Sequence, residues 1–402
     1  MAKNKRLYYA IKQIGITPDA AGATVSSDRE IVYGAQDISI STNFNLTQIF
    51  TMGQLEIYQS LEELPDVEVS ISKVIDGRPL IWHIATKGGS SPPTSPTLAG
   101  RSNEKCILDL GIFPDSNDAA DGTPDSVVQC SGLFPRTLNY NFGIDGAFTE
   151  SLTLVGNDKI FSSDQKIVNP VDTGRRATLS GSSYFPGQFS ASATESPSGI
   201  ERKEALLFAA TGTAITGTDI NGAIADYDIT ILPPEVEGIS SSGTNDKTGS
   251  DFNAHIQSIA ISTDLGREEL NELGRRGPYH RFATFPTEVT CAIEAISTEG
   301  DDVSATEGGI YSTSSAACDG AGSNLKDRTI RIATCGGVRI YLGAKNRLSS
   351  VDFGGGTTDG GNDTNTYNFT NFNILTVMAK YDPHADADTW WDERDKYLLT
   401  TG

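Results

Sequence analysis

Histidine and cysteine are the side chains that most often hold metals or move protons, and this chain has few of either. Its four histidines are scattered along 402 residues: His83, His255, His280 and His384. The five cysteines form no CxxC pair, and no histidine stands near one at ligand spacing. The chain also lacks a GxSxG elbow and an HExxH helix. We therefore predict no catalytic residue, no metal site and no cofactor.

The most motif-like stretch is the glycine-rich run from Gly354 to Asp363. It lacks the lysine and following serine or threonine of a phosphate-binding loop. Asp359, Asn362 and Asp363 could ligate calcium, but their spacing differs from that of an EF-hand. A long glycine-rich turn is the simpler interpretation. Acidic pairs such as Asp301-Asp302 are likewise simpler as solvated loops than as catalytic dyads.

The cysteines could instead serve structure. Cys106 and Cys130 lie in the first half of the chain, and Cys318 and Cys335 lie in the second. Each pair could close a loop as a disulfide after release from a reducing cytoplasm, and five reduced thiols are the alternative. Cys291 alternates with polar residues on an apolar strand face, which predicts a buried free thiol.

Composition favours strands joined by polar loops, because 41 glycines accompany many Ser, Thr, Asn and Asp residues. The formal net charge of −21 argues against a basic nucleic-acid-binding surface. It fits either ordinary solubility or a surface along which a polyanion slides without adhering. No signal peptide or membrane-spanning run is visible, so synthesis in a cytoplasm is expected.

An internal repeat with an offset of 221 residues organises the chain. Residues 36–65 and 257–286 share eight identities over 30 positions. In both copies an alternating strand, with Ile38 or Ile259 on its apolar face, leads into a helix-like stretch that ends at a glycine. Tyrosine, proline and a second alternating strand follow. We expect a short helix before Gly53 and another before Gly274.

Further strands follow each copy. Leu138 to Phe142 and Phe148 to Leu154 predict a hairpin, and so do Thr329 to Ala333 and Val338 to Leu342. Tyr367 to Val377 predicts one last long strand, and Thr389 to Tyr397 a short helix. The fold class is therefore mainly β, with two tandem β-barrel or β-sandwich domains related by duplication and with short helices.

The expected domains are residues 1–165 and 251–402. Residues 166–250 are turn-rich and form either a disordered linker or an ordered excursion, and apolar patches such as 205–208 favour the excursion. Polar positions opposite the apolar strand residues are candidates for lining a lumen or solvated channel. These candidates are Glu68, Ser70, Ser72, Glu288, Thr290 and Glu294.

The stretch Ile38-Ser39-Ile40-Ser41-Thr42-Asn43-Phe44-Asn45 and the following Gly53-Gln54-Leu55-Glu56-Ile57-Tyr58 resemble tail tube proteins of tailed bacteriophages. The strand pair from Asn141 to Asn157 and the run from Ser262 to Leu270 are similar to such proteins as well. Most tube proteins have one barrel per chain and form hexameric rings. Two barrels in one chain imply, by resemblance to tandem tube proteins, trimeric pseudo-hexameric rings.

The resemblance implies a virion tail location, after assembly in the host cytoplasm, and no enzymatic activity. The implied partners are further copies of this chain in stacked rings, tape-measure, tail-terminator and baseplate or tip proteins, and a sheath if the tail is contractile. Genomic DNA would pass through an acidic lumen without specific binding. The alternative is another virion or cell-surface structural protein, such as an adhesin, built from tandem sandwiches. A carbohydrate-active enzyme is a third hypothesis. It requires converging carboxylates and aromatic platforms, and the chain has only three tryptophans.

Overall fold

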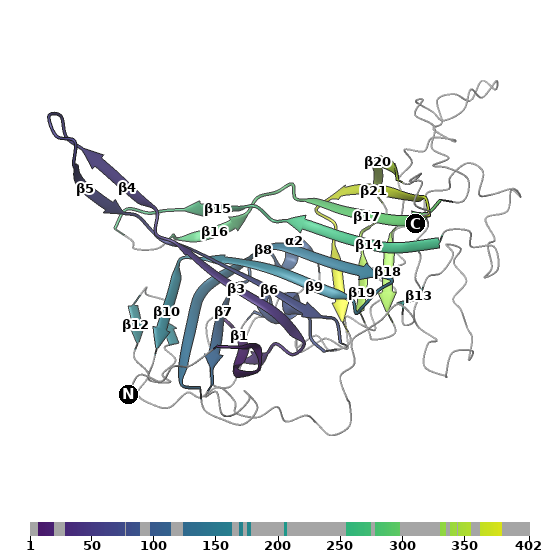
Figure 1. Ribbon diagram of the computed structural model, residues 1–402, viewed down its shortest axis with the longest axis horizontal. Helices are drawn as coiled ribbons and strands as arrows, with labels where there is room; N and C mark the ends of the chain where they lie inside the picture. Colours follow the sequence, from purple (N-terminus) through teal and green to yellow (C-terminus); the bar gives the residue numbers. More distant parts are fainter. Residues whose placement is uncertain are drawn as a thin grey trace, which may run out of the picture.

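The computed structural model describes fourteen stretches of the chain, and most of its regular structure is β (Figure 1). The predicted mainly β class, with few short helices, is confirmed. The described residues are 7–19, 29–76, 78–88, 97–113, 124–162, 169–171, 175–177, 205–206, 255–274, 278–297, 330–334, 338–343, 345–354 and 362–379.

The central element is an antiparallel sheet, here called the main sheet, to which both halves of the chain contribute. Its strand order is β3-β6-β9-β8-β14-β17-β21-β20. The strands from the first half are β3 (Ala35–Asn43), β6 (Asp66–Val74), β8 (Ser126–Gly143) and β9 (Thr149–Gly156). Those from the second half are β14 (His255–Asp264), β17 (Glu288–Ile296), β20 (Arg347–Gly354) and β21 (Thr364–Phe372).

Each half adds a second layer. In the first half, the beginning of β8 leaves the main sheet and pairs with β7 and β10, and β7 continues the layer to β1 and β2. These strands are β1 (Lys12–Pro18), β2 (Glu30–Ile31), β7 (Cys106–Ile112) and β10 (Asp158–Ser162). In the second half a separate sheet has the order β13-β18-β19-β22. Its strands are β13 (Ala205–Leu206), β18 (Arg331–Thr334), β19 (Val338–Tyr341) and β22 (Thr376–Ala379).

Two hairpin arms extend from one end of the main sheet, and the first projects well beyond it in Figure 1. Arm 1 is residues 44–63, with β4 (Leu46–Phe50) paired to β5 (Ile57–Glu62). Arm 2 is residues 265–284, with β15 (Arg267–Leu270) paired to β16 (His280–Ala283). The remaining elements are η1 (Tyr9–Ile11), α1 (Ile81–Ala85), α2 (Leu98–Arg101) and the small pair β11 (Asn169–Val171) and β12 (Arg175–Ala177).

Side-chain alternation divides the main sheet into an apolar face and a polar face. On β6 the pattern of buried and exposed residues alternates strictly, with Val67, Val69 and Ile71 buried. On β17, Val289, Cys291 and Ile293 are buried in the same way. All six belong to one apolar core that runs under both halves of the sheet, so the strand faces were correctly predicted from the alternation.

The four strands from each half form units with the same order and the same hairpin connections, β3-β6-β9-β8 and β14-β17-β21-β20. A bulge interrupts the β3–β6 register at Gln36, and one interrupts β14–β17 at Gln257, at the 221-residue offset. The second hairpin of each unit also has a bulge, at Arg136 and at Ser349. Ile38 and Ile259 thus occupy equivalent positions in their units.

The two short helices expected before Gly53 and Gly274 are wrong, because both segments are the hairpin arms. Gly53 has φ of 88° and Gly274 has φ of 85°, in the left-handed region that glycine favours. A helix C-cap and a tight hairpin turn both require that conformation. The glycines were therefore informative about a chain reversal and not about the structure that precedes it.

The predicted hairpins are present as β8–β9 and β18–β19. The expected single strand from Tyr367 to Val377 is wrong, because β21 and β22 are separate strands in different sheets. The break falls at Asn373, whose φ of 65° is not strand backbone. The helix expected at 389–397 lies outside the described residues.

The strand β13 lies within the segment 166–250 that was expected to connect the domains. It pairs with β18, so at least this part of the segment belongs to the second half's own sheet. β13 also occupies the place next to β18 that β1 occupies next to β7. The domain boundaries 1–165, 166–250 and 251–402 otherwise remain a prediction.

A buried carboxylate fixes α1 on the apolar face of the main sheet. The Glu150 oxygens accept the backbone N–H groups of Ile81 at 2.6 Å and Trp82 at 3.0 Å, and the Tyr140 hydroxyl donates to one of them at 3.3 Å. Burial raises the pKa of Glu150, although these hydrogen bonds and the charge of Lys73 act in the opposite direction. The carboxyl group supplies acceptors that the first turn of a helix otherwise lacks.

We predict that Glu150→Ala lowers the free energy of unfolding by about 2–4 kcal/mol, because two buried N–H groups lose their acceptors. Chemical denaturation of purified protein measures this. Ser151→Ala, on the same strand but facing the polar side, is the matched control and should change stability by less than about 0.5 kcal/mol. Equal effects of the two variants would contradict the assignment.

The pKa shift of Glu150 adds a dependence on pH. Since its folded-state pKa is raised, its stabilising contribution is complete below the unfolded value of roughly 4.3 and is lost as pH rises through the folded value. The stability of the wild type relative to Glu150→Gln should therefore fall as pH increases from acid to neutral.

Candidate functional site: polar face, open edges and arms

The polar face of the main sheet carries all six residues predicted to line a lumen or channel. Register connects them, because a row of directly paired residues runs from Ser72 through Ser151, Asn139 and Ser262 to Thr290. Directly paired residues share one face of a sheet, and so do residues two apart in a strand. Glu68, Ser70 and Ser72 therefore face the same side as Glu288, Thr290 and Glu294. Whether that side faces a lumen, a neighbouring chain or the outside depends on how the chains assemble.

Short polar side chains on this face bind one another across the strands. The Ser70 and Thr153 hydroxyls lie 3.2 Å apart, and those of Ser262 and Thr290 lie 2.6 Å apart. Ser258 donates to Glu294 at 2.9 Å. Such a face is wettable, and it carries the acidic Glu68, Glu288 and Glu294 together with the basic Arg136, which contacts Glu68, and Arg347, which lies opposite Thr370.

The two halves meet where β8 pairs with β14, here called the internal junction. Ile261 lies opposite Tyr140, and Thr263 lies opposite Leu138. Tyr140 and Ile261 are each 1% exposed, and Leu265, just beyond the strand, is fully buried with its N–H donated to the Arg136 carbonyl at 2.8 Å. The junction is therefore a continuous ladder with a closed apolar side.

The outermost strands of the main sheet, β3 and β20, have no further strand beside them among the described residues. Counting from the bulges, Phe353 of β20 corresponds to Tyr140, and Ile40 of β3 corresponds to Ile261. At the 221-residue offset, Phe44 corresponds to Leu265. Phe353 is 53% exposed and Phe44 is 63% exposed, and Ile40 is half-buried. The open edges therefore leave accessible those apolar residues whose counterparts are buried at the internal junction.

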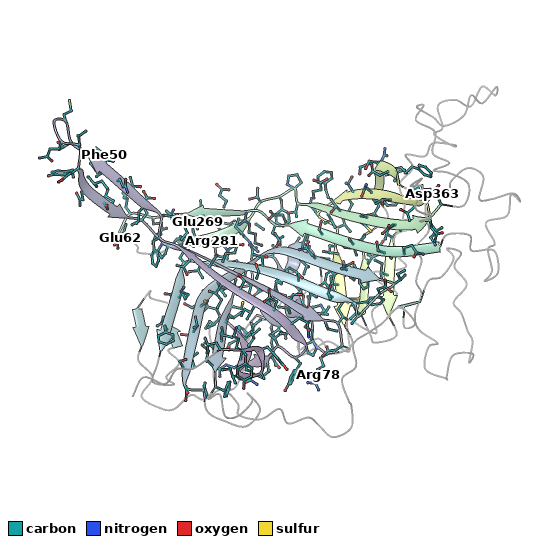
Figure 2. The ribbon with its side chains drawn as sticks, in the orientation of Figure 1. Phe50, Glu62, Arg78, Glu269, Arg281 and Asp363 are labelled. Atoms are coloured by element: carbon teal, nitrogen blue, oxygen red, sulfur yellow. The ribbon has the colours of Figure 1, made fainter. Side chains whose placement is uncertain are left out.

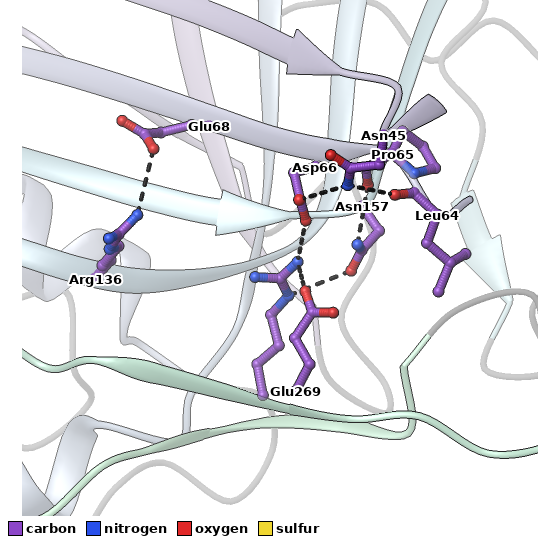
Figure 3. Close-up of polar contacts among 9 residues, drawn as sticks. Asn45, Leu64, Pro65, Asp66, Glu68, Arg136, Asn157 and Glu269 are labelled. Carbon is purple, nitrogen blue, oxygen red and sulfur yellow. Dashed lines mark hydrogen bonds and ion pairs between the residues drawn. The ribbon is translucent and has the colours of Figure 1, made fainter. Parts of the chain in front are cut away.

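Arm 2 is attached to the first half of the chain by two arginines. Figure 2 labels one of them, Arg281, beside Glu269, and Figure 3 shows the polar contacts around Asp66, Asn157 and Glu269. Arg281 contacts Asp66 at 3.1 Å and Asn157 at 3.3 Å, and also pairs with Glu269 of its own arm. Arg267 donates to the carbonyl of Pro135 at 2.7 Å and to that of Ser102 at 2.8 Å.

The same region forms an open polar pocket of about 420 Å³, where arm 2 crosses the end of the main sheet. Three arginines and three carboxylates are among the residues that line it. Its lining residues are Ser41, Asn43, Asp66, Val67, Glu68, Arg136, Val155, Arg267, Glu269 and Arg281. Arg136 lies 3.5 Å from Glu68, and the contact is exposed, so we regard it as weak.

Burial lowers the pKa of Arg267 to about 10, and the nearby charge of Arg281 adds to this effect. The guanidinium nevertheless stays charged at neutral pH and lies 5.4 Å over the Phe134 ring. The His280 ring meets the Phe134 ring edge-to-face and lies tilted against the Phe282 ring. Burial, followed by the charges of Lys105 and Arg267, lowers the pKa of His280. All of these groups lie where arm 2 meets the first half of the chain.

Cys106, Cys130 and Cys291 are buried free thiols, which confirms the prediction for Cys291. Burial raises the pKa of Cys291 and of Cys130 to about 12 each. The possible Cys106–Cys130 bridge is absent: the two lie on neighbouring strands, but Cys106 is opposite Leu133 and Cys130 is opposite Leu108. Cys318 and Cys335 lie outside the described residues, so their pairing stays a prediction.

Within the part of the chain that the structure describes, no group of three or more His, Cys, Asp and Glu side chains could hold a metal ion. No helix in that part is long and apolar enough to cross a membrane.

The edge residues and the arginines of arm 2 were missed in the sequence. The repeat contained a signal for both, because the 221-residue offset aligns Phe44 with Leu265 and Leu46 with Arg267. What the offset could not reveal is which copy is covered. That depends on the pairing of β8 with β14, a contact between the two halves.

Comparison with known proteins gives limited results. No family model matches the chain, and no curated protein matches it. Solved structures that are similar to part of the chain include the following three. The first is a chain of the anti-feeding prophage baseplate, with 12% identity over 40% of this chain and 97% of that chain and a TM-score of 0.28. The second is from the anti-feeding prophage tube-terminating cap, with 8% identity over 40% and 95% and a TM-score of 0.29. The third is from the extended sheath–tube complex of an extracellular contractile injection system, PVC, with 8% identity over 40% and 95% and a TM-score of 0.28. Likeness at this level carries no functional argument.

Proposed function

We propose that this chain is a structural subunit of a phage-tail-type tube, in which three copies close into a ring by pairing β20 of one chain with β3 of the next. The observation that carries the proposal is the match between the open edges and the internal junction. Tyr140 and Ile261 are covered where β8 meets β14, and their counterparts Phe353 and Ile40 remain for a neighbouring chain to cover.

The internal junction also supplies a register for the ring. Ser262 lies opposite Asn139 within the chain, and their counterparts are Ser41 and Asp352. The same correspondence sets Ile40 opposite Phe353. Pairing two open edges removes backbone groups that would otherwise recruit strands indiscriminately. Since each chain has one edge of each kind, the contact is head-to-tail. The chains form a closed ring if the rotation from one chain to the next adds up to a full turn.

Three chains are proposed because each contributes two similar units, which gives six around the ring, as the resemblance to tube proteins implies. The polar face would then line the lumen, with Glu68, Glu288 and Glu294 giving it acidic character. DNA would pass along such a wall without adhering. Stacked rings, tail partners, a virion location and the absence of catalysis belong to this same proposal.

We predict that Phe44→Asp weakens ring formation about tenfold to a hundredfold, because a phenylalanine that should become buried is replaced by a charge. Mass photometry over a protein dilution series measures the effect. Phe161→Asp on β10 is the matched control, since Phe161 is 64% exposed and lies away from both edges of the main sheet. Equal weakening by both variants would argue against the β3 edge.

The register is tested by a cysteine pair. With Cys318 and Cys335 replaced by serine, Ser41→Cys combined with Asp352→Cys should form disulfides between chains upon mild oxidation. The largest covalent product should be a closed trimer on non-reducing gels. Ser39→Cys with Asp352→Cys is the mispaired control and should cross-link poorly. Covalent rings of six chains would refute the trimer.

The assignment of the polar face to the lumen predicts protection from large reagents. In assembled tubes of a Ser70→Cys variant, a small maleimide should react while a polyethylene-glycol maleimide reacts far more slowly than with unassembled protein. Lys159→Cys on β10, whose side chain is exposed, gives the rate at an exposed site away from the polar face. Equal rates for both variants in tubes would place Ser70 on the outside.

A further inference from the structure

The two arms occupy equivalent positions but differ in charge. Arm 1 contains three glutamates and no lysine, arginine or histidine, whereas arm 2 contains four arginines, three glutamates and one histidine. The backbone is nevertheless the same at the base, where Asn45 with φ of 46° corresponds to Gly266 with φ of 47°. The strand registers of the two arms also coincide at the 221-residue offset. Residues of the two arms can therefore be compared position by position.

One face of arm 2 is turned toward the β8–β9 end of the main sheet. It carries Arg267, which donates to the Pro135 carbonyl, and Arg281, which contacts Asp66. Ala283 lies on the same face, because it is paired directly with Arg267 and directly paired residues of a hairpin share one face. The seat of arm 2 within the chain thus depends on two cations that the arm supplies.

The corresponding face of arm 1 has an acidic residue and no cation. Leu46 takes the position of Arg267, and Ser60 takes that of Arg281. Glu62, paired directly with Leu46, stands where arm 2 has an alanine. The side chains of Leu46, Ser60 and Glu62 are all exposed. If arm 1 has a seat of the same kind, the cation has to come from the surface that receives it.

The β20–β21 end of the main sheet supplies such a cation. At the β8–β9 end, the residue beneath arm 2 is Phe134, which lies 5.4 Å below the Arg267 guanidinium and is 5% exposed. The registers on either side of the two bulges place Arg347 at the position of Phe134. Arg347 is exposed. Between the two seats the cation has moved from the arm to the sheet.

The carboxylate of the seat is retained. The pairing of β17 with β21 places Glu288 at the position of Asp66, and Glu288 is exposed. Arm 1 has Ser60 in place of Arg281, so it can offer this carboxylate a hydroxyl hydrogen bond but no charge. An ionic contact between arm 1 and the β20–β21 end therefore depends on Arg347.

We propose that arm 1 seats on the β20–β21 end of a second copy of this chain through an ion pair between Glu62 of the arm and Arg347 of the sheet. The aliphatic stem of Arg347 packs beneath Leu46, at the place where Phe134 packs beneath Arg267 within the chain. The inference rests on the ring proposed above and adds the contact by which each joint recognises its partner.

The two seats reject each other's arms. Arm 2 on the β20–β21 end would set Arg267 against Arg347, and this contact between like charges is unfavourable. Arm 1 on the β8–β9 end would leave Asp66 without the cation that Arg281 supplies and would bring Glu62 to the same surface. The charges therefore favour alternation of the two units around the ring and disfavour contact between units of one kind.

A charge-reversal cycle tests the ion pair. Glu62→Arg and Arg347→Glu should each raise the dissociation constant of the ring at least about tenfold, because each sets two like charges together at every joint. The variant that combines both reversals restores an opposite pair, so its dissociation constant should return to within about threefold of the wild-type value. Mass photometry over a protein dilution series measures all three variants.

Glu56→Arg is the matched control, since it is the same substitution at an exposed position of the same arm, outside the β4–β5 pairing. It changes the net charge of the chain equally and should not weaken the ring. Circular dichroism and thermal unfolding of each monomer identify any variant that fails to fold. In that case Glu62→Gln and Arg347→Gln form a milder cycle, in which the double variant should lose no more affinity than either single variant.

The outcomes separate the two proposals. If the double reversal is no better than the worse single reversal, or if Glu62→Arg behaves like Glu56→Arg, the ionic seat is wrong. The disulfide from Ser41→Cys and Asp352→Cys still reports the ring in that case, since it lies on the strand edges and not in the arm. If the wild type forms no closed ring, the proposed function itself fails, and the seat with it.

Discussion

The pairing of β8 with β14 is the contact on which the rest of the architecture depends. Seven residue pairs from Ser258–Gly143 to Asp264–Thr137 join the halves in one ladder. Without it, the chain would be two separate four-stranded units, each with two open edges. With it, the polar face becomes continuous from β3 to β20, and a single apolar core extends beneath both units. The ladder also shows how the edge strand of one unit, β8, pairs with the first strand of the other, β14, which is the counterpart of β3.

Buried polar groups position several elements of the first half. Glu150 holds α1, and the Arg29–Asp109 pair lies at 2.8 Å inside the adjoining layer, almost without exposure. Burial raises the pKa of Asp109, although its contact with Arg29 opposes this. Such pairs contribute little net stability relative to apolar residues, but removal of one partner is costly. Their main effect is therefore to specify one arrangement of helix, strand and layer, and their contribution to the free energy of folding is smaller.

The sequence was sufficient for those features that depend on local periodicity. Alternation at Val67, Val69 and Ile71, and again at Val289, Cys291 and Ile293, assigned both strands and their buried faces. Glycine at 53 and 274 indicated chain reversal but was assigned to helices, because a C-cap and a hairpin turn require the same backbone. The strand break at Asn373 was invisible, since asparagine adopts left-handed φ without a distinctive local pattern. The arginine contacts of arm 2 join residues up to 215 positions apart, so no local pattern could predict them.

A mechanical consequence follows from β8, whose 18 residues take part in two layers. Its first part belongs to the layer with β7 and β10, and its second part to the main sheet. Because the layers share one covalent backbone, sliding one over the other requires that β8 break its ladder on one side. Among the described residues of the second half no strand takes part in both layers, since β19 and β20 are separate there. Each chain therefore combines a stiff unit with a more compliant one, and a wall built from such chains would bend most easily at every second unit.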